Sequence, residues 1–260
     1  MGRLHLFEFN DQPWLPTLLR DALTGYLETI SRKMGMHEPM VPVLQDLLAR
    51  TGATRIIDLC SGATGPLLDI RPALPDAVEI VFTDKYPNVT AFTRASAQPG
   101  IRAHLEPVDA TAVPAELSGL RTVFNALHHF RPETARAILA DAARQGAPIA
   151  VFELSERTIA NVLTAPLIML FVWIFMPAVK PHRWTRLLFT YPIPIIPLLI
   201  FWDGLVSHLR AYSLDELDEL TRGLDDDGYT WHRERLPVLD GKAHITVLTG
   251  VPAQDPQPRP

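Results

Sequence analysis

The first strand of the chain and the turn that follows it read Arg55-Ile-Ile-Asp-Leu-Cys60-Ser-Gly-Ala-Thr-Gly65-Pro66. Residues 55–60 form a short run of mainly apolar side chains, which predicts a strand buried on both faces of a parallel sheet. Two glycines follow, and glycine lets the backbone turn sharply and approach a ligand closely. A helix that begins after such a turn presents free backbone N–H groups. The stretch therefore predicts a ligand-binding turn at the carboxyl end of a strand.

The alternation of strand and helix continues as far as residue 153. Strands that alternate with helices at this spacing form βαβ units, whose right-handed crossovers place helices on both faces of a mostly parallel sheet. The predicted strands are 55–60, 78–84, 101–105, 122–127 and 148–153, and the predicted helices are 67–72, 88–97 and 132–144.

Two further strands close the predicted sheet. Residues 229–236 and 244–251 are joined by the turn 237–242, which predicts an antiparallel hairpin. With the five earlier strands they give an α/β fold: a seven-stranded, mostly parallel sheet with helices on both faces and a closing antiparallel hairpin.

Apolar periodicity and composition divide the chain into four parts. Helical spacing of apolar residues precedes the first strand, an uncharged and proline-containing segment follows the fifth, and the C-terminus is rich in proline. The predicted parts are an N-terminal helical cover over 1–52, an α/β core over 53–156 and 213–251, an apolar insertion over 157–212, and a disordered tail over 252–260.

Composition excludes several classes of protein. The chain has 260 residues, of which 47% are hydrophobic and 20% charged, and these proportions exclude a disordered chain or a coiled coil. A net charge of −5 argues against binding to a nucleic-acid backbone. Cys60 is the one cysteine, and the N-terminal residues show no apolar export signal. We therefore expect a cytoplasmic location.

Asp84 ends the second predicted strand, about 20 residues after the glycine turn. A carboxylate at this place suits the two hydroxyls of a ribose. A dinucleotide site would require glycine where Cys60 stands, because that position makes the tight turn over the pyrophosphate. A nucleoside without phosphates tolerates the change more readily.

Four stretches, taken in order, resemble the class I S-adenosylmethionine-dependent methyltransferases. The likeness implies a Rossmann-like fold, S-adenosyl-L-methionine as cofactor and transferase activity. The closing hairpin also separates this family from the dehydrogenases, whose sheets are normally all parallel. The four stretches are Asp58-Leu-Cys-Ser-Gly-Ala-Thr-Gly65, Phe82-Thr-Asp84, Val108-Asp-Ala-Thr111 and Val123-Phe-Asn-Ala-Leu-His-His-Phe130.

The resemblance also implies a set of cofactor-binding residues. The first turn would shape the pocket around the methionine part of the cofactor, Asp84 would accept both ribose hydroxyls, and Asp109 would bond the adenine amino group. Alternative interpretations stay open: the two glycines could form an ordinary turn, and Asp109 could cap a helix. The implied residues are Asp58, Cys60, Ser61, Gly62, Gly65, Asp84, Asp109, Ala110, Asn125 and Leu127.

Three titratable residues are candidates for catalysis. His128 and His129 follow the fourth strand, and Glu153 ends the fifth, where this fold places its reaction centre. Methyl transfer needs a base only if the acceptor carries a proton that must leave early, and imidazole has a suitable pKa. The histidines could instead support the loop, and Glu153 could cap a loop or helix. No metal site is predicted, because the other histidines lack metal-ligand spacing.

The insertion is net positive in an otherwise acidic chain. Two uncharged runs, 158–179 and 187–202, flank a basic turn that holds Lys180, Arg183 and Arg186. The first run just reaches the roughly 20 residues that span a bilayer, whereas the second is short and contains three prolines. Three interpretations remain: a spanning helix, an interfacial hairpin with peripheral membrane association, or a lid or homodimer contact.

The sequence thus predicts methyl transfer to a small hydrophobic or aromatic acceptor. The predicted substrate-binding residues are Trp14, Trp173 and Trp202, although burial of Trp14 in the core is a competing interpretation. One alternative is a membrane-associated methyltransferase that acts on a lipid-soluble substrate. Another is a cofactor-binding protein without catalysis, in which the insertion is an interaction surface.

Overall fold

The computed structural model describes residues 2–225 and 228–253. The chain forms two compact units, each built from separate stretches of sequence. Unit 1 contains the residues up to His37 together with Ser155–Ser213, and unit 2 contains Glu38–Leu154 and the residues from Leu214 onward. The predicted disordered tail lies, from residue 254 on, outside the described residues.

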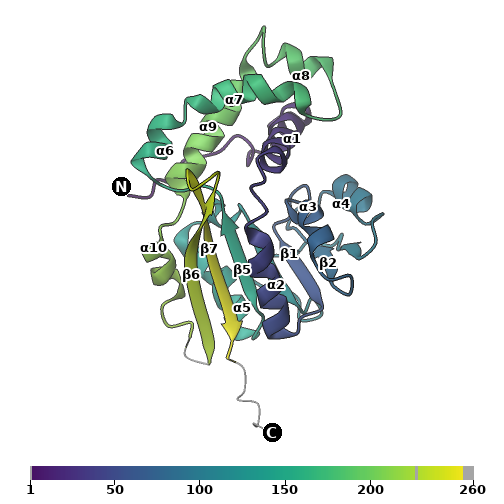
Figure 1. The fold of residues 1–260 in the computed structure, drawn as a ribbon, viewed down its shortest axis with the longest axis vertical. Coiled ribbons are helices and arrows are strands. Elements are labelled where there is room, and N and C mark those ends of the chain that lie inside the picture. The colour runs from purple at the N-terminus through teal and green to yellow at the C-terminus, as the bar shows by residue number, and fades with distance from the viewer. Residues whose placement is uncertain (1, 226–227, 254–260) are drawn as a thin grey trace. The chain divides into compact units, whose positions relative to one another are not determined.

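Unit 2 is built on a seven-stranded sheet with the order β3-β2-β1-β4-β5-β7-β6 (Figure 1). The first five strands are parallel, and β7 runs antiparallel to both β5 and β6. The predicted α/β fold and closing hairpin are therefore confirmed. The strands are β1 Arg55–Leu59, β2 Glu79–Phe82, β3 Ile101–Ala103, β4 Leu120–Phe124, β5 Ile149–Glu153, β6 Tyr229–Val238 and β7 Ala243–Pro252.

The helices of unit 2 connect these strands and bury one face each. Strands β4 and β5 are buried along their whole length. The run 149–152 of β5 is apolar, as burial on both faces requires, whereas β4 also buries Arg121, whose Nη1 lies 2.8 Å from the carboxylate of buried Asp141. Gly52 ends α2 in the left-handed conformation, at φ +64°. The helices are α2 Met40–Thr51, α3 Leu67–Ile70, α4 Val89–Ala95, α5 Pro132–Arg144 and α10 Leu214–Thr221, with single 3₁₀ turns η1 Arg71–Ala73 and η2 Leu127–His129.

Helix α2 belongs to the sheet-containing unit and not to an N-terminal cover ending at residue 52. Its apolar side chains Met40, Leu44 and Leu47 are buried in the same core as Ile56 of β1 and Phe82 of β2. The boundary between the N-terminal part and the core therefore falls at residue 37 and not at residue 52.

Unit 1 is helical, and its core joins the N-terminal helix to the insertion. Leu23 and Tyr26 of α1 are buried with Val172 and Met176 from the first uncharged run and with Ile200 from the second. The helices are α1 Thr17–Lys33, α6 Ile159–Thr164, α7 Leu167–Phe175, α8 Trp184–Leu188 and α9 Ile195–Arg210, with the 3₁₀ turn η3 Met176–Ala178.

Two buried polar side chains of α9 hold the N-terminal segment. The Asp203 carboxylate accepts hydrogen bonds from the backbone N–H groups of Phe9 at 2.7 Å and Asn10 at 3.0 Å. The Arg210 guanidinium donates to the backbone oxygen of Leu6 at 2.7 Å and to the carboxylate of Asp11 at 2.8 Å. These bonds satisfy buried charges and fix an irregular segment against a helix.

The spanning interpretation of residues 158–179 is wrong. The run is divided into α6, α7 and η3, with Pro166 between the two α-helices and Pro177 in the 3₁₀ turn. Across residues 2–225 and 228–253, none of the helices combines the length and the apolar character that crossing a bilayer requires.

Candidate functional site

A cavity of about 530 Å³ opens at the carboxyl ends of the parallel strands of unit 2. Strand order reverses at β1, whose neighbours are β2 and β4, and open α/β sheets bind ligands at such a point. Cys60 follows β1, Asp84 follows β2, and Asp109 lies in the connection after β3. The lining residues are Cys60, Asp84, Lys85, Tyr86, Val108, Asp109, Ala110, Thr111, Phe130, Glu133, Thr134, Ala137 and Ile138.

The turn after β1 is built from left-handed backbone. Cys60, Gly62, Thr64 and Gly65 have φ values of +58°, +55°, +87° and +52°. Glycine adopts this conformation without steric cost, whereas for other residues it costs roughly 1–2 kcal/mol. Two of the four positions thus carry strain that a glycine-richer turn would avoid, and the turn still forms.

Asp84 ties this turn to the second strand. Its Oδ2 accepts a hydrogen bond from the backbone N–H of Gly62 at 2.9 Å, and its Oδ1 accepts from the N–H of Tyr86 at 2.8 Å. The side chain is only partly buried and lines the cavity. Each carboxylate oxygen has further lone pairs. Asp84 can therefore accept additional donors from a ligand.

Asp109 lines the same cavity and lies in a tight local hydrogen-bond network. Its Oδ1 accepts from the backbone N–H of Thr111 at 2.9 Å and from the Thr111 hydroxyl at 2.7 Å, and its Oδ2 lies 2.7 Å from Lys85 Nζ. The bonds from Lys85 and Thr111 lower the pKa of Asp109 to about 2. The residues that follow form a turn and not a helix, so the helix-cap interpretation of Asp109 is wrong.

Asp58 lies inside the sheet and not on the cavity wall. Thr122 on β4 donates its hydroxyl to Asp58 Oδ1 at 2.7 Å. Burial raises the pKa of Asp58 to about 7, against hydrogen bonds from Ser61 and Thr122 that lower it. Burial, with the nearby Asp84 charge, also raises the pKa of Cys60 to about 12, so this thiol is protonated at neutral pH.

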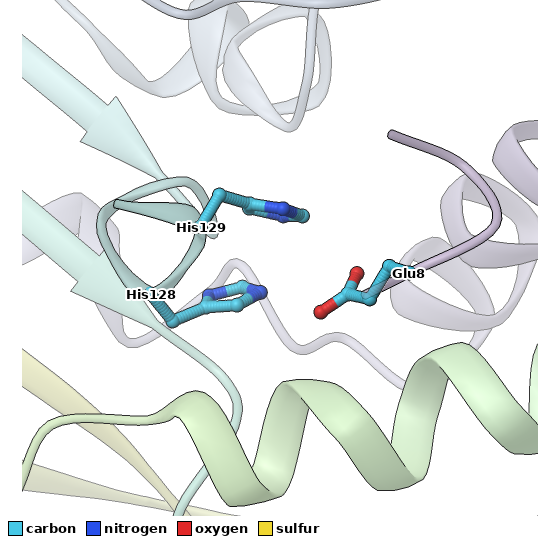
Figure 2. Close-up of side chains that lie close together, drawn as sticks. All are labelled: Glu8, His128 and His129. Atoms are coloured by element: carbon cyan, nitrogen blue, oxygen red, sulfur yellow. The ribbon is translucent and has the colours of Figure 1, made fainter. Parts of the chain in front are cut away.

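His128 and Glu153 form a buried pair at the ends of β4 and β5. His128 Nδ1 lies 2.5 Å from Glu153 Oε2, and Glu153 Oε1 accepts from the N–H of Leu127 at 2.7 Å. Burial raises the pKa of Glu153, but the His128 ring and these hydrogen bonds outweigh it, and the pKa lies below its usual value. The ring of His129 lies 4.2 Å from that of His128, centre to centre (Figure 2).

Asn125, like Leu127, supports the loop that carries these histidines. Its backbone has φ +48°, a conformation that asparagine tolerates better than most residues. Its Oδ1 accepts from the N–H of Leu154 at 2.7 Å, and its own N–H donates to Phe152 O at 2.8 Å. These bonds join the loop after β4 to the end of β5.

The structure brings part of the predicted set together. Cys60, Asp84, Asp109 and Ala110 line one cavity, whereas the other predicted cofactor-binding and catalytic residues lie outside its lining. Among the residues that the sequence analysis missed, Thr134, Ala137 and Ile138 share one face of α5 at helical spacing. That spacing is a signal that could have placed them. The predicted residues outside the lining are Asp58, Ser61, Gly62, Gly65, Asn125, Leu127, His128, His129 and Glu153.

The three predicted substrate-binding tryptophans all belong to unit 1. Trp14 is 63% exposed, so the interpretation of Trp14 as a buried core residue is wrong. Its ring and that of Trp202 both pack against Phe9, at 6.1 and 6.4 Å between ring centres. Trp173, on α7, donates its Nε1–H to the backbone oxygen of Thr190 at 3.2 Å.

Comparison with known proteins rests on structure, because no protein-family profile and no curated protein sequence matches the chain. Two forms of the methyltransferase domain of a bacterial Hen1 protein, CtHen1-CN and CtHen1-C, each align with a TM-score of 0.52. Identity is 13% for the first and 11% for the second, over 83% and 84% of this chain and 98% and 99% of theirs. The magnesium protoporphyrin IX methyltransferase of Synechocystis PCC 6803 aligns at 0.47, with 11% identity over 86% of this chain and 87% of its own.

The fold of the chain is therefore the Rossmann-like fold of class I methyltransferases. The similarity to the Hen1 domains agrees with the strand order and with the antiparallel seventh strand of unit 2. The fold expectation that followed from the four sequence stretches is confirmed.

Proposed function

We propose that the protein is an S-adenosylmethionine-dependent methyltransferase whose cofactor binds in the cavity of unit 2. The observation that carries the proposal is that Asp84 and Asp109 line one cavity, beside a turn of left-handed backbone. Carboxylates at these two strand ends match the ribose hydroxyls and the amino group of an adenosine.

The chemistry of the cavity fits such a nucleoside. Its volume, about 530 Å³, lies within the range of roughly 300–1,000 Å³ that is typical of small-molecule sites. Phe130, Ala110 and Ile138 supply apolar wall for a flat base, and the two carboxylates supply acceptors. Lys85 would share the Asp109 carboxylate with the adenine amino group.

A nicotinamide dinucleotide fits less well. Its pyrophosphate needs close approach of the backbone, which glycine at the first position of the turn provides. Cys60 holds that position here with φ +58°, and its side chain lines the cavity.

Calorimetric titration with S-adenosylmethionine and S-adenosylhomocysteine tests the proposal in the Asp84→Asn variant. The amide keeps an acceptor for the Tyr86 N–H but loses the charge. We expect binding to weaken at least about tenfold, because charge-assisted hydrogen bonds contribute roughly 1.5–3 kcal/mol each.

Asp76→Asn is the matched control, since Asp76 is an exposed aspartate that lies before β2 and outside the cavity. The affinity of this variant for both ligands should equal that of the wild type. Equal affinity in a folded Asp84→Asn protein, or tight binding of a nicotinamide dinucleotide instead, would contradict the proposal.

His128 is the proposed general base, and Glu153 its positioning residue. The bound cofactor supplies an electrophilic methyl group. Glu153 fixes the orientation of the His128 ring through Nδ1, so Nε2 is the ring nitrogen assigned to proton transfer. Because both Glu153 oxygens accept hydrogen bonds from the loop that carries His128, Glu153 acts through that residue and not on the acceptor.

The proposed acceptor is a small hydrophobic or aromatic molecule. Support comes from the aromatic cluster of unit 1, in which Phe9, Trp14 and Trp202 present partly exposed rings. Incubation with methyl-labelled cofactor and fractionated small molecules from host cells should label an apolar compound. Label found only in polymeric nucleic acid or protein would contradict this acceptor class.

A further inference from the structure

Helix α7 is apolar on all sides, although only one side faces the core of unit 1. Val172 is buried, and Ile168 and Phe175 pack against the same core, next to α1 and α9. A helix that is apolar all round normally buries its whole surface in a protein or a membrane. We therefore expect another molecule to cover the exposed side of α7.

That second side forms a continuous exposed row. Leu167, Leu170, Phe171 and Ile174 recur at three- and four-residue spacing, which places them on one helix face, and each is at least 40% exposed. Helix α6 precedes α7 directly, and both lie along α9 (Figure 1). It adds Ile159 and Leu163, which are 69% and 74% exposed. We call these six residues the α6–α7 apolar surface.

The end of α7 leads into a cationic turn. Lys180, His182 and Arg183 are exposed, and Trp184 beside them is 73% exposed. Residues 157–202 contain no Asp or Glu. Asp21 of α1 lies 3.7 Å from Arg183, with both side chains about half exposed. An ion pair this exposed contributes little to the stability of the fold.

The turn has a defined shape although it is exposed. Arg186 is buried, and its Nη1 donates to the backbone oxygen of Val179 at 2.9 Å and to that of Pro181 at 3.1 Å. These bonds hold the chain on both sides of Lys180. The cationic side chains are thus presented from a structured turn beside α7.

We propose that the α6–α7 apolar surface and the turn at 180–184 dock on an anionic lipid membrane. Apolar segments too short to span a bilayer are found at re-entrant and interfacial positions, and exposed Lys, Arg and Trp side chains are typical of the headgroup level. Charge decides between lipid and a second copy of the chain. A second copy would offer the same segment, 157–202, which contains no Asp or Glu to complement the cationic turn, whereas anionic headgroups do complement it.

Vesicle sedimentation with the full chain tests the proposal. Vesicles of phosphatidylcholine containing about one-third phosphatidylglycerol should bind the protein, and pure phosphatidylcholine vesicles should bind it much more weakly. Binding to the anionic vesicles should fall as salt rises, because exposed charges are screened. Failure to bind the anionic vesicles, or equal binding to both kinds, would overturn the proposal.

Two variants separate the apolar and the charged contributions. Leu170→Ser with Ile174→Ser should weaken partitioning about a hundredfold, since each side chain loses its transfer into the interface. Lys180→Gln with Arg183→Gln should weaken it about twenty-five-fold, because each charge near the surface contributes about a factor of five. Both pairs of residues are exposed, so thermal unfolding should stay close to that of the wild type.

Matched controls use exposed residues elsewhere. Leu105→Ser in unit 2 and the double variant Lys33→Gln with Lys242→Gln should leave vesicle binding unchanged. Equal losses in these controls would overturn the proposal. A protein that does not bind vesicles would also overturn it if sedimentation velocity showed a dimer that Leu170→Ser with Ile174→Ser abolishes. If the serine variant does not fold, the glutamine variant decides.

Discussion

The carboxyl group of Asp58 sits inside the sheet, where burial raises its pKa from 3.8 to about 7. The folded protein therefore holds this proton more tightly than the unfolded chain does. The stabilisation from the protonated group is complete below pH 4 and is lost as pH rises through about 7. A pKa difference of about three between the folded and unfolded states corresponds to roughly 4 kcal/mol in the free energy of unfolding.

We predict that Asp58→Asn removes this part of the pH dependence. The amide oxygen can still accept the Thr122 hydroxyl, and it carries no charge at any pH. Urea unfolding from pH 4.5 to 8 should show the wild type losing stability relative to the variant as pH rises. Parallel curves for the two proteins would show that Asp58 does not titrate in this range.

At the same scale, Glu153→Gln tests whether His128 is held for proton transfer. The amide fills the same space but cannot compensate an imidazolium charge. We expect turnover to fall roughly 10²–10⁴-fold, and a His128→Ala protein to lose a similar factor, with cofactor affinity nearly intact.

The pH profile of turnover separates positioning from a structural role. If Glu153 acts through His128, the pKa that governs turnover should fall in Glu153→Gln, because the neighbouring negative charge is gone. Glu116→Gln, at an exposed residue of unit 2, serves as control and should leave the profile unchanged. Losses of only a few-fold in both site variants would mean that the acceptor needs no base.

Among the elements, the turn between β1 and α3 allows a matched comparison of two glycines. Gly62 and Gly52 have φ values of +55° and +64°, and a Cβ at either would meet open space. Alanine at each position should therefore destabilise the protein by a similar amount, about 1 kcal/mol, from backbone strain alone.

We predict that only the change in the turn affects cofactor binding. Gly62 donates its N–H to Asp84 in the cavity, whereas Gly52 ends α2. Titration with S-adenosylhomocysteine should show weaker binding for Gly62→Ala and unchanged binding for Gly52→Ala. Equal affinities in the two variants would show that the turn does not shape the site.

Helices and strands were predicted well where one local sequence signal dominates. The run at 55–60 contains β1 Arg55–Leu59, because a short apolar run bounded by a turn is typical of a buried parallel strand. The predicted helix over 132–144 is α5 Pro132–Arg144, because proline suits the first turn of a helix. The insertion was harder, since two prolines divide a run whose composition alone resembles a single long helix.

Side-chain partners in the site could not be read from local signals. Asp84 was predicted because it ends the second strand about 20 residues after the first turn, and Asp109 was implied by the resemblance to the methyltransferases. The pairing of Lys85 with Asp109 depends instead on the connections after β2 and β3 lying side by side, where the N–H of Val108 donates to the backbone oxygen of Asp84 at 2.9 Å. The pairing of His128 with Glu153 likewise depends on β4 and β5 being neighbours in the sheet.

For the molecule as a whole, the sequence pattern did not predict that the N-terminal part and the insertion fold as one unit. The contact from Phe9 to Asp203 spans 194 positions. The sequence around Phe9 contains no periodic pattern that would indicate Asp203 as its partner, because a backbone N–H is present at almost every residue. Buried Asp203 and Arg210, in an otherwise apolar helix, were the one available hint.

A crystal structure of the full chain with S-adenosylhomocysteine tests the central claim most directly. The account predicts difference density for the nucleoside in the cavity of unit 2, with the ribose hydroxyls at Asp84 and the adenine amino group at Asp109. Density for the ligand at another place, or an empty cavity at saturating ligand, would contradict the assignment of this cavity as the cofactor site.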